Sequence, residues 1–137
     1  MRGEVVIDAS VAAKVFFTED GSDRARALGT DGRRFAAPEF ITLEIASVAS
    51  KYARRSLIDA DHGREAIRSI PDLIDDLEPV SSLAGRAFDL SILHGFSVHD
   101  ATYLALAEAL GSVVITADEK LAARAREAGL GALIENL

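Results

Sequence analysis

The hydrophobic residues of the chain follow two patterns, short apolar runs and longer stretches with helical spacing. The runs at 5–7, 35–37 and 113–115 predict buried strands, and the last of them, within SVVITA, is the clearest. The strongest helix is predicted in EFITLEIASVASKYARR, where apolar residues recur every three or four positions. Apolar strands that alternate with helices indicate a mainly parallel sheet with helices on both faces, which is an α/β fold.

The same patterns divide the whole chain into elements. We predict strands at 4–8, 34–38, 112–117 and 131–137, and a further short strand within EPVSS at 78–82. We predict helices at 9–18, 22–28, 39–55, 59–77, 82–95, 97–111 and 118–129. Pro71 is expected to break or restart the helix over 59–77, because proline lacks the N–H that a helix interior requires. Gly95 and Gly111 are suited to end the two helices that precede them.

Length and composition narrow the class of protein. The 137 residues suit one compact domain, so we predict a single domain over 1–137. The absence of cysteine excludes disulfides and thiolate-bound metals, and the three histidines lack metal-type spacing. The charged N-terminus is unlike a signal peptide, and no apolar run is long enough to span a bilayer. We therefore expect a cytoplasmic protein without a membrane partner.

The net charge of −7 argues against nucleic-acid binding, since nucleic-acid-binding domains are usually basic. The argument fails if acidic side chains gather around divalent cations, because bound cations change the working charge of such a site. The positions of the acidic residues are therefore informative.

Four acidic residues stand out, and each also has an ordinary explanation. Asp8 and Asp118 each precede a predicted helix, where an aspartate caps the first turn, and Asp100 lies at capping-box spacing from Ser97. Glu44 is different, because it lies on a largely apolar helix face without a lysine or arginine three or four positions later. It either reaches solvent at the edge of that face or needs a partner inside the protein.

Considered together, these residues predict a metal site. The carboxyl ends of parallel strands meet at one edge of a sheet, and Asp8 and Asp118 both follow predicted strands. Asp100 begins the helix that leads into SVVITA, and the helix of Glu44 is able to lean over the same edge. Carboxylates close together require a cation between them, and a donor set made only of carboxylate oxygens suits Mg²⁺ or Mn²⁺.

Four segments carry a resemblance to a known family. VVIDASVAAKVFF, APEFITLEIASVASKYAR, FSVHDATYLALAEALG and VVITADEKLAARA resemble, in this order, the motifs of PIN-domain ribonucleases, most closely the VapC-type toxins of toxin–antitoxin pairs. The stretch 55–95 carries no such motif. The resemblance implies a PIN-like three-layer sandwich with a mainly parallel central sheet, and one PIN domain over 1–137. It implies an acidic quartet that is both catalytic and metal-binding, and this quartet falls on Asp8, Glu44, Asp100 and Asp118. It also implies that two hydroxyls belong to the catalytic site, and these fall on Ser10 and Thr116.

The same resemblance implies an activity and its partners. The expected activity is Mg²⁺- or Mn²⁺-dependent endonucleolytic cleavage of RNA that leaves 5′-phosphate and 3′-hydroxyl ends. The expected partners are a cognate antitoxin and a second copy of the chain in a homodimer.

Position near the predicted site suggests further contacts. Candidate phosphate-binding cations are Lys14, Lys51, Arg54, Arg55 and Lys120. Candidate side chains for an antitoxin groove are Phe16, Phe17, Phe40 and Ile41.

Two other classes of protein remain as alternatives. One is a PIN-like module that binds RNA or protein without catalysis, although an intact acidic quartet argues against it. The other is a receiver-type phosphoacceptor domain, which needs an adjacent acidic pair after its first strand. Asp8 is instead followed by Ala9 and Ser10, which disfavours the receiver. The same DAS segment lacks the second aspartate that a dehalogenase-type phosphatase requires.

Overall fold

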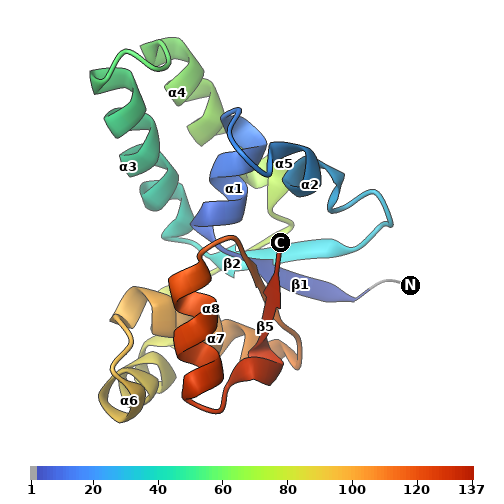
Figure 1. Cartoon of the computed structure of the whole chain (residues 1–137), viewed down its shortest axis with the longest axis vertical. Helices are drawn as coiled ribbons and strands as arrows, with labels where there is room; N and C mark the ends of the chain where they lie inside the picture. Colours follow the sequence, from blue (N-terminus) through green and yellow to red (C-terminus); the bar gives the residue numbers. More distant parts are fainter. Residues whose placement is uncertain (1–2) are drawn as a thin grey trace.

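A five-stranded sheet in which every pair of neighbours is parallel lies at the centre of the protein (Figure 1). The structure is a computed structural model and describes residues 3–137. The strands are β1 (Glu4–Ile7), β2 (Arg34–Pro38), β3 (Asp76–Glu78), β4 (Val114–Thr116) and β5 (Ile134–Asn136). They lie in the order β3-β2-β1-β4-β5. The parallel sheet predicted from the apolar strands is confirmed.

Helices cover both faces of this sheet. They are α1 (Ala9–Phe16), α2 (Ser22–Ala27), α3 (Ile41–Arg54), α4 (Ala60–Arg68), α5 (Ile70–Leu73), α6 (Ala84–His94), α7 (Val98–Leu110) and α8 (Glu119–Glu127). Figure 1 shows α1, α2 and α5 on one side of the sheet and α6, α7 and α8 on the other. Helices α3 and α4 pack together as a hairpin that extends away from the sheet. The predicted three-layer arrangement is therefore also confirmed.

The strand order creates a crevice at one particular place. From β1 the chain runs outward to β2 and β3, and then returns to place β4 on the other side of β1. Ligands of open parallel sheets bind where the order reverses in this way, outside the carboxyl ends of the two strands concerned. Here those strands are β1 and β4. The order 3-2-1-4-5 also differs from the 2-1-3-4-5 order of receiver domains, which excludes that alternative.

Helix α7 is the most deeply buried helix of the fold. All seven residues from Ala101 to Ala107 are buried, and the helix contacts β1, β2 and β4. Alanine at 101, 105 and 107 leaves room for the helix to lie close to the strands. Because the middle of α7 is held so firmly, the residues of its first two turns, among them Asp100 and Tyr103, are fixed relative to the crevice.

The edge of the sheet at β3 differs from the prediction. The helix predicted over 59–77 ends at Leu73, and Asp76–Glu78 instead pairs with β2. Asp75 secures this pairing, because its N–H donates to the carbonyl of Phe35 and its carboxylate accepts from the N–H of Phe35. The short strand predicted in 78–82 was wrong, since only Glu78 belongs to a strand and Val80–Ser82 forms a 3₁₀ turn. Pro79 intervenes and has no N–H with which to continue a strand ladder.

Pro71 acts as predicted. Helix α4 ends at Arg68, and a new short helix, α5, begins at Ile70 with Pro71 in its first turn. A proline is tolerated there because the first N–H groups of a helix have no partner within it. Across residues 3–137, none of the helices has the length and apolar character needed to cross a membrane.

Candidate active site

Asp8 lies at the carboxyl end of β1 and is almost completely buried, with 5% of its surface exposed. It is the N-cap of α1, since its Oδ1 accepts a hydrogen bond of 3.2 Å from the N–H of Val11. The capping explanation is therefore correct, but it accounts for only one of the bonds. Ser10 Oγ also donates to Oδ1, and Thr116 Oγ1 donates to Oδ2, each at 2.5 Å. Both carboxylate oxygens are thus held from two sides of the crevice.

Ser10 and Thr116 are themselves held by the turn between β4 and α8. The N–H of Ala117 donates to Ser10 Oγ, and the N–H of Asp118 donates to Thr116 Oγ1, both at 3.0 Å. A hydroxyl that accepts from a backbone N–H is free to direct its own proton elsewhere. Here both protons point to Asp8. The two hydroxyls predicted from the sequence therefore position this carboxylate at the carboxyl ends of β1 and β4, where the strand order reverses.

Glu44 lies in the first turn of α3 and is half-buried. Its partner is a phenol, because Tyr103 Oη donates a hydrogen bond of 2.5 Å to Oε1. Tyr103 is 2% exposed, and burial, together with the nearby charge of Glu44, raises its pKa well above the usual value. The phenol therefore keeps its proton and remains a donor. Tyr103 was not predicted as a site residue, although its position three residues after Asp100 indicates a shared helix face.

Asp100 and Asp118 lie at the starts of two helices, as predicted. The N–H of Asp100 donates to Ser97 Oγ, the N-cap of α7. Asp118 is the N-cap of α8, and its Oδ1 accepts from the N–H groups of Lys120 and Leu121. Both cap bonds use the same oxygen, so capping does not require Oδ2.

The four carboxylates affect one another's charge, and we call them the acidic cluster; its members are Asp8, Glu44, Asp100 and Asp118. Burial is the main cause that raises the pKa of the first three. The charge of Asp118 further raises the pKa of Asp8 and Asp100, although hydrogen bonds to Ser10 and Thr116 lower that of Asp8. Asp8 and Asp100 both raise the pKa of Glu44, against the lowering effect of Tyr103. The fold thus gathers negative charge at the crevice.

Nothing in residues 3–137 neutralises this charge by a direct ion pair with the acidic cluster. Arg124 is close enough to lower the pKa of Asp100, but its guanidinium donates to the carbonyl of Gly95 and lies 5.3 Å from the ring centre of Phe96. Over the same residues, no three acidic or histidine side chains converge closely enough to hold a metal ion.

The donor set nevertheless fits a divalent metal. It consists only of carboxylate oxygens, it is partly withdrawn from water, and no lysine or arginine of the described residues forms an ion pair with it. Hard cations such as Mg²⁺ and Mn²⁺ take oxygen ligands of this kind.

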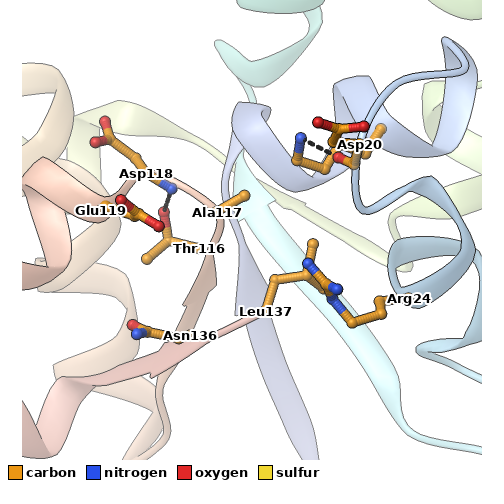
Figure 2. A pocket seen from close by; sticks show the side chains of 9 residues that line it. Asp20, Arg24, Thr116, Ala117, Asp118, Glu119, Asn136 and Leu137 are labelled. Carbon is orange, nitrogen blue, oxygen red and sulfur yellow. Dashed lines mark hydrogen bonds between the residues drawn. The ribbon is translucent and has the colours of Figure 1, made fainter.

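A cleft of about 240 Å³ opens beside Thr116 and Asp118 (Figure 2). Its lining comes from the β4–α8 turn, the end of β5 and the α1–α2 region: Lys14, Asp20, Arg24, Thr116, Ala117, Asp118, Glu119, Asn136 and Leu137. Figure 2 shows Thr116 and Asp118 on one side and Arg24 on the other. Lys14 Nζ donates to the carbonyl of Asp20 at 2.6 Å and to Glu19 at 3.3 Å. This candidate phosphate-binding cation is therefore already engaged.

Two other sets of sequence-predicted residues are only partly brought to the site. Lys51 and Arg54 lie in the last turn of α3, whereas Glu44 lies in its first. Of the four candidates for an antitoxin groove, Phe17 and Ile41 are 2% and 0% exposed and belong to the core, so that prediction was wrong for both. Phe16 and Phe40 are partly exposed.

Comparison with known proteins identifies the family of the chain. The family model described as PIN domain matches residues 5–127, a stretch that contains the whole acidic cluster. Ribonuclease VapC3 of Pyrobaculum aerophilum is 30% identical over 121 residues, which cover 87% of this chain and 92% of that protein. Ribonuclease VapC9 of Mycobacterium tuberculosis is 36% identical over 117 residues, which cover 85% of this chain and 87% of that protein.

Solved structures show the same fold. PAE2754 from Pyrobaculum aerophilum superposes with a TM-score of 0.68 at 20% identity, over 98% of this chain and 92% of the other. VapBC2 from Rickettsia felis, bound to a DNA fragment from its promoter, gives 0.68 at 11% identity over 98% of each chain. The fold is that of a PIN domain. From the sequence relatives, the chain belongs to the VapC branch of the PIN-domain family.

Proposed function

We propose that the protein is an endoribonuclease that requires Mg²⁺ or Mn²⁺, and that it is the toxin of a toxin–antitoxin pair. Similarity to relatives named as VapC ribonucleases supports the ribonuclease activity. The observation that carries the proposal is the buried carboxylate of Asp8, which Ser10 and Thr116 hold from both sides of the crevice without a counter-ion among the described residues. A residue that served only as a helix cap would not need this arrangement.

The acidic cluster is proposed to hold the metal, with Asp8 and Asp100 as direct ligands and Glu44 and Asp118 as direct or water-mediated ligands. A bound divalent ion supplies Lewis-acid stabilisation of the phosphate and a more acidic water. The remaining residues prepare the site. Ser10 and Thr116 keep both oxygens of Asp8 oriented. Tyr103 stabilises the ionised form of Glu44 against the cost of burial, and so keeps that carboxylate available.

The proposed partners are an antitoxin and a second copy of the chain. The structural neighbour from Rickettsia felis is VapBC2, a VapBC complex, and a comparable pair is proposed here. Large apolar side chains on the surface support contacts with other proteins; they include Leu43, Phe88, Ile92 and Leu93, each more than half exposed. Encounter with RNA and an antitoxin fits the cytoplasmic location expected from the sequence.

Cleavage of an RNA panel tests the enzymatic part. The purified protein should cut at least one RNA with Mg²⁺ or Mn²⁺ present, should lose this activity in EDTA, and should lose it on Asp8→Asn. A folded protein that binds RNA but cuts none of the panel with either metal would identify the non-catalytic module instead.

Co-expression with the genes that flank its own tests the toxin part. A small partner should co-purify and inhibit cleavage. If a cationic side chain of that partner reaches the acidic cluster, raising Mg²⁺ should partly restore activity. An unchanged cleavage rate in the purified complex would contradict this mode of inhibition.

A further inference from the structure

A pair of aromatic rings borders the acidic cluster. His99 lies in the first turn of α7 and is exposed, and its ring centre is 4.7 Å from that of Phe40, at an interplanar angle of 56°. Phe40 also meets the ring of Tyr103 edge-on, at 5.5 Å and 82°. Since Tyr103 is buried, Phe40 is supported from the core side. It in turn supports the ring of His99 at the surface.

This ring pair lies next to two of the carboxylates. His99 directly precedes Asp100 in α7, and the ring of Phe40 contacts Tyr103, whose phenol donates to the carboxylate of Glu44. A planar group resting on His99 would therefore be adjacent to the proposed cleavage site.

The charge of the protein favours such a contact. The chain as a whole carries a net charge of −7, and Lys14 is already engaged by Glu19 and by the backbone carbonyl of Asp20, so long-range electrostatic attraction to an RNA backbone is weak. Stacking of a base on an aromatic ring does not depend on net charge, and proteins that bind single-stranded RNA commonly use it.

We propose that His99, supported by Phe40, is a platform on which one base of the single-stranded RNA substrate stacks, and that it thereby sets where the backbone crosses the acidic cluster. This inference rests on the proposed ribonuclease function. His99 is a positioning residue in this account, because it contacts a base and not the reacting phosphate.

Substitution of His99 tests the platform directly. His99→Ala should raise KM for a short fluorescent RNA about five- to 150-fold, the range expected for the loss of one base–ring stack, and should change kcat much less. His99→Phe should restore KM to near the wild-type value, because it keeps the ring and loses only the nitrogens. His94→Ala is the matched control, since His94 also pairs its ring with a phenylalanine, Phe96, but at the end of α6.

An abasic RNA identifies the stacked base. Single abasic substitutions are placed in turn on either side of the scissile bond. At one position, the missing base should weaken binding of the RNA to the protein with an intact His99. At that same position, it should not weaken binding to His99→Ala, which has already lost the stacking contact. The dissociation constants are measured by fluorescence anisotropy with Asp8→Asn as the background, so that the RNA stays intact.

The possible outcomes separate the two proposals. If the wild type cuts RNA but His99→Ala has an unchanged KM, the platform is refuted and the ribonuclease function stands. If His99→Phe is as defective as His99→Ala, the ring nitrogens and not the stacking surface matter, which also refutes it. If the abasic effect adds fully to His99→Ala at every position, no base rests on this residue. A wild type that neither binds nor cuts RNA would overturn both proposals.

Discussion

Tyr103 and Glu44 are 59 positions apart in the chain, yet the phenol of one donates a hydrogen bond of 2.5 Å to the carboxylate of the other. Tyr103 belongs to α7, which also carries Asp100, and Glu44 belongs to α3. The bond therefore fixes the position of one carboxylate of the acidic cluster relative to another. It also supplies a neutral donor where a basic partner would compete with a metal ion.

Tyr103→Phe should impair activity most at low pH. The phenol lowers the pKa of Glu44, which burial raises, so its removal should raise that pKa further. Because a carboxylate must be ionised to bind a cation, the acidic limb of the kcat/KM profile should move to higher pH. Leaving a half-buried acceptor unpaired should also cost about 1–3 kcal/mol of unfolding free energy.

A tyrosine outside the site provides the control for this experiment. Tyr52 Oη donates at 2.8 Å to Glu19, a carboxylate that is not part of the acidic cluster. Tyr52→Phe should leave the pH profile of cleavage unchanged. A profile for Tyr103→Phe that coincides with the wild-type curve would contradict the proposed role of the phenol.

Divalent metal should stabilise the wild-type protein. An ion that binds only the folded state adds about 2.7 kcal/mol when its concentration is 100-fold above its Kd. Melting curves in Mn²⁺ and in EDTA should therefore differ by several degrees for the wild type. Asp8→Asn should abolish the difference. Because the amide removes a buried charge but also replaces one of the two accepting oxygens, the response to Mn²⁺ and not the Tm in EDTA is the measure. An equal response to Mn²⁺ in both proteins would exclude Asp8 from the metal site.

Substitutions of Asp118 distinguish a metal ligand from a residue that serves only as a helix cap. Asn caps helices about as well as Asp, so Asp118→Asn should keep its cap on α8 and lose one charge of the acidic cluster. We expect it to be at least as stable as the wild type in EDTA but to gain less from Mn²⁺ and to cleave RNA more slowly. Asp118→Ala should in addition lose the cap, at a cost of about 1 kcal/mol.

Asp59 is the matched comparison, because it caps α4 through a bond of 2.7 Å to the N–H of His62 and is not part of the acidic cluster. Asp59→Asn should change neither the Mn²⁺ response nor cleavage. If Asp118→Asn behaves in the same way, Asp118 is a cap and nothing more.

The free energy of unfolding should fall as pH rises, because the carboxyl groups of Glu4 and Asp76 share a hydrogen bond. A shared hydrogen bond with Asp76, followed by burial and charge repulsion, raises the pKa of Glu4 from 4.5 to about 7, although Arg34 lowers it. A carboxyl whose pKa is higher in the folded state favours folding below its unfolded pKa. This contribution is fully present below pH 4.5 and is lost as pH rises through 7.

Glu4→Gln should therefore flatten the dependence of unfolding free energy on pH between 5 and 8, measured by urea denaturation in EDTA. The buried carboxylates of the acidic cluster shift in the same direction, so part of the slope should remain. Glu127→Gln removes an exposed carboxyl at the end of α8 and should leave the slope as in the wild type. An unchanged slope for Glu4→Gln would show that the pair does not share a proton.

Local patterns in the sequence were sufficient to predict most of the architecture. Apolar runs and helical spacing each depend on neighbouring residues, so the strands β1, β2 and β4 and the main helices were predicted within a few positions. The sequence also predicted that Asp8 and Asp118 lie at the same edge of the sheet, because the carboxyl ends of parallel strands share an edge whatever the strand order. The capping and the site explanations of Asp8 were both correct, since one carboxylate has oxygens enough for both.

The tertiary structure decided what depends on contacts between distant segments. The third strand lies at Asp76–Glu78 because Asp75 pairs with Phe35, forty positions earlier, and this outweighs a helical pattern. Tyr103 is the partner of Glu44 only because α3 and α7 approach each other at that point. Phe17 and Ile41 are buried whereas Phe16 and Phe40 are partly exposed, although the sequence treats all four alike. A residue's neighbours along the chain determine its backbone conformation, but only the packing of whole elements determines which side chains meet.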